Sequence, residues 1–424
     1  MKKDYRKKIS EGFYKDLFIT FLGQIVVMVL SFVLNKIISN QYSVSDFGIY
    51  NLLKRQISVI TFVMLMAMGI TIPKYISEAL AKKSNLLLKK YLVSSLGIIL
   101  VVSVLISLVS IIWRNELSYL IFADTSFRNY MIPSLLYSFG SALIAYSFSY
   151  YRGINNFVRY AIINIIMQIF LIVPTILFRL DLFNIHFTWG IILVVYGLSE
   201  VIVIFYKNKL HFGLLSKSCL EIKELWTYSW PRVPGEFVLF AFNLVPLMVI
   251  GGKFGAEQVG YFSAAISINS LITPFFGLVG TILLPLVSRS KFDNTEKEVN
   301  QKIKILGYIY VGISILAILF VTIFGKYILI ILLNHNYIKS MTIVKLTIFS
   351  ILPNSIYLLL RNPIDAKSKF PYNTIILIFT FVIYTIALLL APSIEMSGVA
   401  MTIAYIFLGG ASIFIWIKMN KTIE

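Results

Sequence analysis

The chain has 424 residues, of which 58% are hydrophobic and 13% are charged. That charged share is about half of what a soluble domain carries, and the mean hydropathy is +0.84. A soluble protein is excluded, because too few charges are present to coat a water-facing surface of this size. The single cysteine, Cys219, excludes a disulfide scaffold, and three histidines between apolar segments give no basis for a His/Cys metal site.

Twelve apolar runs follow one another along the chain, each near the roughly 20 residues needed to cross about 30 Å of hydrocarbon. Because the bilayer offers no water to backbone groups, these runs are predicted to be helices. The first run is too long for a signal peptide and lacks a small-residue cleavage site, so it is expected to stay as an anchor. The twelve runs are 17–38, 48–72, 91–113, 130–151, 157–178, 186–206, 226–250, 258–288, 304–324, 341–360, 371–391 and 396–417.

Lysine and arginine are distributed unevenly over the connections between these runs. With a cytoplasmic N-terminus, the inner connections carry 27 of the 38 basic residues and the outer connections carry 6. The positive-inside rule therefore predicts both termini in the cytoplasm. The net charge of +19 is explained by this topology and by anionic lipid, so no nucleic-acid partner is expected.

The connections themselves are short. None exceeds about 20 residues, a length that leaves no room for a soluble catalytic domain. Gly252 and Lys253 are followed by Phe254 rather than by Ser or Thr, so the sequence lacks a Walker motif. ATP-driven transport by this chain alone is excluded.

An internal repeat spans half the length of the chain. When the sequence is shifted against itself by half its length, 44–50 lies over 256–262, and Gly48 matches Gly260. When that shift is reduced by one position, a second stretch matches, with 114–130 over 325–341.

Each half of the repeat contains six predicted helices. Because six is even, both halves enter the membrane in the same direction, an arrangement that alternating-access transporters use. The sequence therefore predicts an all-α membrane protein with about twelve transmembrane helices in two parallel-repeat lobes around a central cavity. The predicted lobes are residues 1–212 and 213–424.

Polar residues recur on one face of four predicted helices. In the first helix they are spaced by 4, 7 and 4 residues, which keeps them on one face: Thr20, Gln24, Ser31 and Asn35. The half-length shift places the first three over Arg232, Glu236 and Asn243 in the seventh helix. The second and eighth helices carry Asn51, Lys54, Arg55, Ser58 and Thr61, and Ser263, Ser267, Ser270 and Thr273. These rows either line a common water-filled cavity or hold helices together.

Charged residues inside the spans need a reason, because a charge at the bilayer centre costs about 2.5–3.5 kcal/mol by insertion scales. Arg55 lies seven residues into the predicted helix 48–72, about 10 Å along its axis, with Lys54 beside it. A role in the cavity is favoured for this pair over snorkelling or structural pairing.

Other charges in the spans leave alternatives open. Arg232 has Glu236 one turn further on, so a structural ion pair and a role with the substrate both remain. Lys36 is close to the outer end of the first helix, where snorkelling is the default. Glu200 is a weaker candidate for a cation or proton site. The deep charges are mainly positive, so an anionic cargo is expected.

Four segments resemble those of a known family. Residues 45–50 and 69–73, within twelve helices arranged as two parallel lobes, resemble the polysaccharide flippases (Wzx type) of the multidrug/oligosaccharidyl-lipid/polysaccharide exporter superfamily. Residues 151–157 share the resemblance, as does the echo formed by Arg361 and residues 370–371. The resemblance covers the whole chain.

This resemblance implies a V-shaped pair of lobes around a cationic cavity. Family members move a polyprenyl-pyrophosphate-linked sugar repeat unit from the inner to the outer leaflet of the bacterial plasma membrane, and basic residues of the cavity hold the pyrophosphate. It implies no cofactor, and its partners are the lipid-linked glycan, membrane lipids and, downstream, a glycan polymerase with its chain-length machinery. The predicted substrate-binding residues are Lys54, Arg55, Arg232, Glu236, Gln24, Asn243 and Lys36.

Three functions are compatible with these sequence features. The first is a flippase for an O-antigen or capsule type of lipid-linked oligosaccharide. The second is a cation-coupled multidrug exporter of the same superfamily, which would be expected to carry a deep carboxylate, and only Glu236 and Glu200 are available. The third is a membrane enzyme such as a glycan polymerase or ligase. Such enzymes generally need a sizeable external loop, whereas even the longest outer connections, 114–129 and 325–340, are short.

Overall fold

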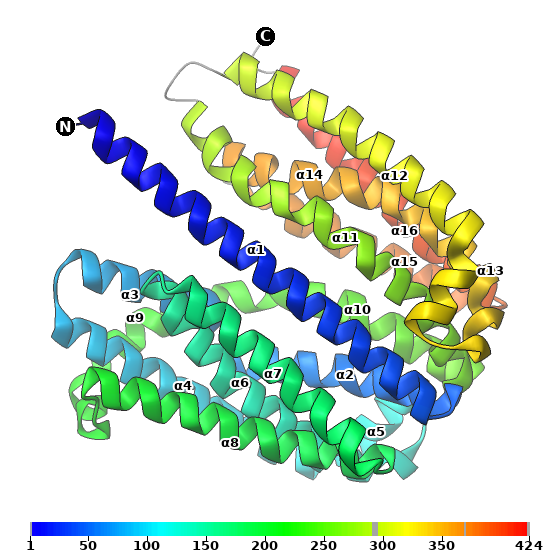
Figure 1. Cartoon of the computed structure of the whole chain (residues 1–424), viewed down its shortest axis with the longest axis horizontal. Coiled ribbons are helices and arrows are strands. Elements are labelled where there is room, and N and C mark those ends of the chain that lie inside the picture. The colour runs from blue at the N-terminus through cyan, green and yellow to red at the C-terminus, as the bar shows by residue number, and fades with distance from the viewer. Residues whose placement is uncertain (1, 291–295, 369, 422–424) are drawn as a thin grey trace. The chain divides into compact units, whose positions relative to one another are not determined.

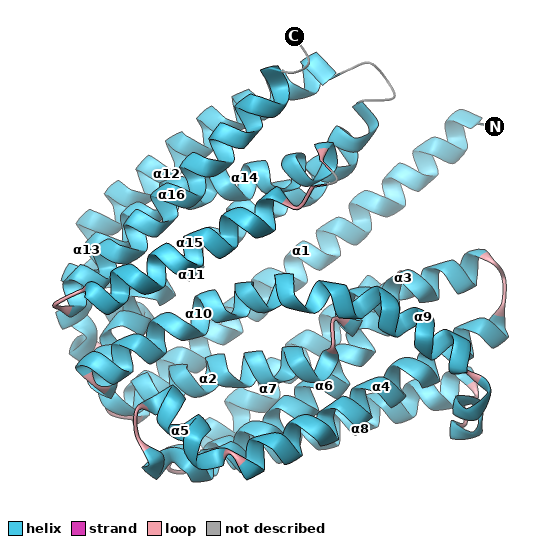
Figure 2. Ribbon diagram, turned by 180° about the vertical axis from the view of Figure 1, so that it is seen from behind, coloured by secondary structure: helices cyan, strands magenta, loops and turns pink. Residues whose placement is uncertain are grey.

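The computed structural model describes residues 2–290, 296–368 and 370–421. Over these residues the chain consists of α-helices joined by 3-10 turns and short loops, with no strand (Figure 2). Eleven helical segments of this part are long and apolar enough to cross a membrane. The remaining predicted span, 258–288, is the helix α11 (Ala256–Ser290), whose side chains are described only in part. The all-α membrane class with about twelve spans is therefore confirmed.

The helices form two compact units. Unit 1 comprises Met1–Tyr42 and Leu53–Phe240, and unit 2 comprises Ser43–Leu52 and Ala241–Glu424. The helices α2 and α10 therefore contribute residues to both units. These units are defined by packing, whereas the lobe boundary at residue 212 was inferred from the repeat and stays a prediction.

Unit 1 contains the first nine α-helices, apart from the first turns of α2. Trp189 fixes two of its helices together, because the indole N–H donates to the carbonyl oxygen of Leu171 at 2.8 Å. Figure 1 shows α6, α7 and α8 side by side, in agreement with their mutual packing. The helices are α1 (Lys2–Gln41), α2 (Val44–Leu65), α3 (Met68–Ala81), α4 (Asn85–Ile112), α5 (Arg114–Phe122), α6 (Met131–Gly153), α7 (Phe157–Phe178), α8 (Leu182–Asn208) and α9 (Cys219–Ser229), with the 3-10 turns η1 (Thr125–Tyr130), η2 (Phe212–Lys217) and η3 (Trp230–Arg232).

The predicted second span, 48–72, is not one helix. It divides into α2 and α3 at Met66 and Ala67, which adopt left-handed φ angles of 46° and 56°. Both residues are buried, and the main-chain N–H and side-chain hydroxyl of Thr71 donate to the carbonyl oxygen of Ala67. The prediction was wrong here because neither residue is the glycine that normally marks such a break.

Unit 2 is organised around α14, which packs against α11, α12 and α16. The ammonium group of Lys253 donates to the carbonyl oxygens of Leu389 and Ala391, both at 2.7 Å, and so caps the end of α15. The elements are the later part of α10 (Val233–Phe254), α11 (Ala256–Ser290), α12 (Glu296–Leu332), η4 (His335–Ser340), α13 (Met341–Thr347), η5 (Ile348–Ser350), α14 (Ile351–Lys367), α15 (Tyr372–Leu390) and α16 (Ile394–Lys421).

Two glycines matched by the repeat, Gly48 and Gly260, pack against each other within unit 2. A Cβ atom on Gly48 would lie 2.1 Å from the carbonyl oxygen of Ala256, and one on Gly260 would lie 2.2 Å from that of Val44. The same half-length shift relates Val44 to Ala256, so the contact is reciprocal. Only glycine permits so close an approach of two backbones. The register of the repeat is confirmed here as a symmetric helix crossing.

The two halves also share a capped turn. The carboxylate of Asp124 accepts a hydrogen bond from the main-chain N–H of Ser126 at the start of η1, which holds the pKa of that carboxyl below its usual range. Asn334 accepts from Asn336 in the same way at the start of η4. Asp124 and Asn334 are separated by one position less than the shift that was predicted to place 114–130 over 325–341.

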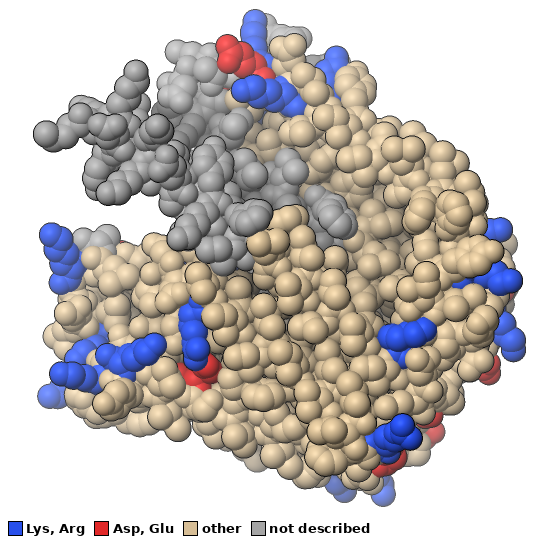
Figure 3. Space-filling view, viewed as in Figure 1, with Lys and Arg blue, Asp and Glu red and all other residues tan. Residues whose placement is uncertain are grey.

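Broad surfaces of the molecule carry no charge. On the face shown in Figure 3, large areas lie between the described Lys, Arg, Asp and Glu side chains. Val101 and Leu105 of α4 and Leu316 and Ile323 of α12 are each more than half exposed. Runs of exposed aliphatic side chains along a helix are suited to contact with lipid rather than water.

Candidate functional site

Lys54 and Arg55 lie in the middle of α2, in the part that belongs to unit 1. Because α2 begins at Val44, Arg55 lies about 16 Å along the helix, deeper than the predicted start at residue 48 implied. Lys54 is exposed and Arg55 is half-buried within the unit. Adjacent residues on a helix point about 100° apart, so the two cations cover a broad face of α2.

The predicted residues of α1 do not gather at one point. Gln24 is exposed and Lys36 is half-buried, and the separation of twelve positions in the sequence corresponds to about 18 Å along the helix. Ser31 belongs to the same polar row and donates a hydrogen bond to Gln168 of α7 at 3.4 Å. At Ser31, the structure thus supports the interpretation that polar residues hold helices together.

The seventh predicted span begins later than expected. The structure places Arg232 at the end of η3, directly before α10, rather than six residues into a helix starting at 226. The physical reason is the Trp-Pro-Arg sequence, because proline favours the first position of a new helix over its interior. The side chains of Arg232 and Glu236 lie outside the described residues. Asn243 is exposed and belongs to unit 2.

A cavity of about 370 Å³ opens within unit 2. Its wall comes from α10, α11, η5, α14 and α16, and none of its described lining residues is charged. Four lining residues are apolar, and seven carry neutral hydrogen-bonding groups: Asn243, Asn269, Ser270, Thr273, Ser350, Asn354 and Tyr405. The structure thus brings together Asn243 and two members of the polar row of α11, while the role of Asn243 in substrate binding stays a prediction.

The polar groups of the cavity differ in what they can offer to a ligand. The hydroxyls of Ser270 and Thr273 donate to main-chain carbonyls one turn earlier on α11, so their oxygens remain as acceptors. Asn269 is 6% exposed and donates from its amide nitrogen to the carbonyl oxygen of Thr347 at 3.2 Å. Its amide oxygen is buried and has no hydrogen-bond partner among the described residues.

Four polar residues that line this cavity were not predicted from the sequence: Asn269, Ser350, Asn354 and Tyr405. Asn269 and Asn354 are amides inside long apolar runs. An amide in such a run is itself a signal, but the prediction relied only on the rows of polar residues that share one helix face. Asn269 also precedes Thr273 by four residues, so the two share a helix face. No local sequence feature predicts the register with which α14 and α16 pack against α11.

Glu200, proposed as a cation or proton site, is paired in the structure. Its carboxylate accepts a hydrogen bond from the guanidinium of Arg159 at 2.6 Å, and the Glu200 side chain is 4% exposed while that of Arg159 is 35% exposed. This contact joins α7 to α8 inside unit 1. The pair is therefore a structural ion pair in this conformation.

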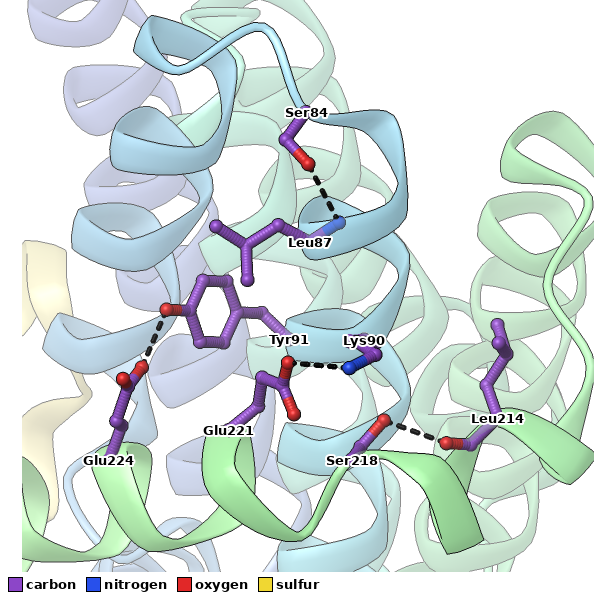
Figure 4. A network of polar contacts seen from close by, with 8 residues as sticks. All are labelled: Ser84, Leu87, Lys90, Tyr91, Leu214, Ser218, Glu221 and Glu224. Carbon is purple, nitrogen blue, oxygen red and sulfur yellow. Dashed lines mark hydrogen bonds and ion pairs between the residues drawn. The ribbon is translucent and has the colours of Figure 1, made fainter.

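A second polar network fixes the segment that follows α8. Glu221 of α9 forms an ion pair with Lys90 of α4 at 2.9 Å, and Glu224 accepts a hydrogen bond from the hydroxyl of Tyr91 at 2.6 Å (Figure 4). Ser84 caps the start of the same α4 helix. The two carboxylates of α9 thus bind α4 of unit 1. Residues 226–229, predicted as the start of the seventh span, belong to this docked helix.

The sequence matches one protein family over more than half of its length. The family is described as polysaccharide biosynthesis protein, and its model matches residues 13–291. The chain belongs to this family. Among curated protein sequences, none matches.

Solved structures show the fold to which the chain is similar. An inward-facing multidrug resistance transporter of the MATE family and MOP superfamily has a TM-score of 0.80 at 11% identity, covering 95% of this chain and 98% of that chain. The lipid II flippase MurJ, in an inward closed conformation, has a TM-score of 0.76 at 15% identity, covering 95% and 87%. A MATE transporter of Vibrio cholerae has a TM-score of 0.63 at 16% identity, covering 98% of both chains.

These comparisons confirm the expected resemblance in family and in fold. The chain is a multi-pass membrane protein of the polysaccharide biosynthesis family with the two-lobed fold of MOP-superfamily transporters. The relatives with this fold are transporters and a flippase.

Proposed function

We propose that the protein is a flippase for a polyprenyl-pyrophosphate-linked oligosaccharide of the O-antigen or capsule type. It would move this lipid from the inner to the outer leaflet of the bacterial plasma membrane by alternating access, with both termini in the cytoplasm. The observation that carries the proposal is the pair of adjacent cations on α2, in a chain of the polysaccharide biosynthesis family.

The chemistry of the substrate explains why such cations would be kept. Charges within a span are costly, and a pyrophosphate supplies the opposite charge that offsets this cost. The guanidinium of Arg55 can form two parallel hydrogen bonds to phosphate oxygens, and Lys54 adds a compact point charge. Gln24, Lys36, Arg232, Glu236 and Asn243 complete the proposed substrate-binding set.

The test uses a strain that lacks the gene. Lipid-linked glycan is assayed for sidedness with an impermeant reagent in intact spheroplasts, and the intact gene is expected to restore its outward movement. Replacing both cations, Lys54→Gln with Arg55→Gln, is expected to lower this movement at least about tenfold, since two charge-assisted contacts are lost. Lys326→Gln, at an exposed position on α12, is the matched control for the loss of a positive charge.

Two results would contradict the proposal. Full outward movement by the Lys54→Gln/Arg55→Gln variant would refute the site, and a glycan that reaches the outer face in the deletion strain would refute the function. External repeat units that remain unpolymerised in that strain would indicate a step after the flip.

The alternative is a cation-coupled multidrug exporter, which the likeness to a MATE transporter favours. Such an exporter needs an available deep carboxylate, whereas Glu200 is already paired with Arg159. Drug sensitivity of the deletion strain with normal external glycan would favour the exporter. Accumulated inner-leaflet glycan with unchanged drug sensitivity would favour the flippase.

A further inference from the structure

We propose that the neutral cavity of unit 2 binds a sugar ring of the transported glycan. This inference rests on the proposed function and adds a second subsite to it. The amides and hydroxyls of this cavity would hold the uncharged part of the headgroup.

The size and polarity of the cavity indicate a ligand rather than simple helix packing. Protein interiors are close-packed, with few voids larger than a water molecule, whereas this cavity has about 370 Å³ and falls in the range of small-molecule pockets, roughly 300–1,000 Å³. A polar cavity of this size holds water when no ligand is present. A ligand with hydroxyl groups can replace such water while it reproduces the water's hydrogen bonds.

The arrangement of exposed and buried groups gives the cavity a rim and a floor. Asn243 and Ser270 are exposed, whereas Asn269 and Ser350 are buried. Polar groups therefore continue from the opening to the base of the cavity. An apolar drug would leave the buried amide oxygen of Asn269, which has no partner among the described residues, without a hydrogen bond.

The mixture of donors and acceptors fits a polyhydroxyl compound. The oxygens of Ser270, Thr273 and Ser350 can accept hydrogen bonds, because their own protons point to main-chain carbonyls. The amide of Asn354, which has no hydrogen bond to another described residue, can both donate and accept. A sugar hydroxyl also does both, so it can pair with either kind of group.

The ring of Tyr405 adds a flat surface to the same wall. It lies edge-to-face with Phe242, with 5.6 Å between the ring centroids, which restricts its orientation. The apolar face of a sugar ring can pack on such a surface while its hydroxyls reach the amides.

A cation is less well suited to this cavity. No carboxylate occurs among its described lining residues, so an ion that entered would not be neutralised, and burying an uncompensated charge is expensive. Amide oxygens and hydroxyls can still coordinate sodium, and the test therefore includes sodium as an outcome.

Two substitutions separate a ligand-binding role from a structural one. Asn354→Leu removes an amide that has no described protein partner, so we expect it to leave thermal stability unchanged. Asn269→Leu also removes a buried oxygen without a partner. The carbonyl of Thr347, to which Asn269 donates, keeps its hydrogen bond from Ser350 at 2.6 Å, so the melting temperature should hold or rise. Asn164→Leu, at a half-buried amide of α7 outside the cavity, is the matched control.

The experiment measures ligand-induced thermal stabilisation of the purified full-length protein. One ligand is undecaprenyl pyrophosphate, and the other is the glycan-linked lipid purified from the strain that lacks the gene. We expect the wild-type protein to respond to both, at lower concentrations for the glycan-linked lipid. Asn354→Leu and Asn269→Leu should lose this difference, a weakening of about tenfold or more, while their response to undecaprenyl pyrophosphate stays unchanged.

The outcomes distinguish this inference from the proposed function. An equal response of the wild-type protein to both lipids, or an advantage for the glycan that survives in both variants, overturns the sugar subsite and leaves the flippase intact. No response to either lipid overturns the proposed function as well. Stabilisation of the wild type by sodium in place of potassium, lost in both leucine variants, would identify a cation site instead and overturn the inference.

Discussion

Replacing Gly48 with alanine tests the reciprocal contact between α2 and α11. The new Cβ atom would lie 2.1 Å from the carbonyl oxygen of Ala256 and 2.9 Å from the main-chain nitrogen of Gly260. Both neighbours are backbone atoms, so no change of rotamer can relieve the clash. The two helices must separate at their closest point.

The size of the effect follows from this distance. Ordinary van der Waals contact begins near 3.4 Å, so the helices must move apart by about 1 Å, which forfeits a quarter to a half of the dispersion energy of nearby contacts. Among these is Phe47, whose side chain is fully buried and whose ring centroid lies 5.1 Å from that of Tyr337. Overpacking costs about 3 kcal/mol, and the higher helix propensity of alanine returns about 1 kcal/mol. A net destabilisation of about 2 kcal/mol is expected.

Thermal unfolding of the purified variants measures this effect. For a unit of this size, about 2 kcal/mol corresponds to a fall in Tm of about 4–8 °C. Gly260→Ala is expected to behave similarly, since its Cβ atom would lie 2.2 Å from the carbonyl oxygen of Val44. The double variant should lose less than the sum of the two, because both side chains force the same separation.

Gly410→Ala provides the control, because a Cβ atom at Gly410 of α16 would have no neighbour within 4 Å. Its Tm should stay the same or rise slightly from helix propensity. A Gly48→Ala variant as stable as Gly410→Ala would refute the reciprocal contact.

Two further substitutions test features inside unit 1. Arg159→Met should lower the stability by about 2 kcal/mol, because it leaves the buried carboxylate of Glu200 without its partner. In thermal unfolding, the double variant that also carries Glu200→Gln should recover most of this loss. A double variant that recovers none of it would contradict the pairing. Ala67→Gly should raise the stability by up to about 1 kcal/mol, because glycine adopts the left-handed φ of 56° without strain. Ala79→Gly in the regular part of α3 should instead lower it by about 1 kcal/mol, and equal effects of the two glycines would show that the break at residue 67 is not strained.

The membrane class, the approximate positions of the spans and the repeat could be predicted from the sequence. The predicted helix 157–178 coincides with α7 (Phe157–Phe178), and the repeat that matches Gly48 with Gly260 predicts two positions that contact each other in the structure. These features are local: the bilayer requires each span to be long and apolar whatever its neighbours are. A glycine at a repeated position likewise permits close packing of helices in both halves of the repeat.

Helix interruptions depended on the tertiary structure. Met66 and Ala67 carry no local signal for a left-handed turn, yet the packing of unit 1 holds both in that conformation. Residues 226–229 were assigned to the following span, but in the structure they belong to α9, which Glu221 and Glu224 bind to α4.

The cavity was decided by tertiary structure alone. Among the predicted substrate-binding residues whose side chains the structure describes, Asn243 lines it. Asn269 and Asn354 meet there because α11 packs on α14, and Tyr405 joins them from α16. Hydropathy reports how each helix meets the lipid, but the positions at which helices meet one another depend on the fit of their side chains over the whole unit. A cavity forms where the side chains of several helices do not fill the space between them, so it cannot be predicted from any single segment.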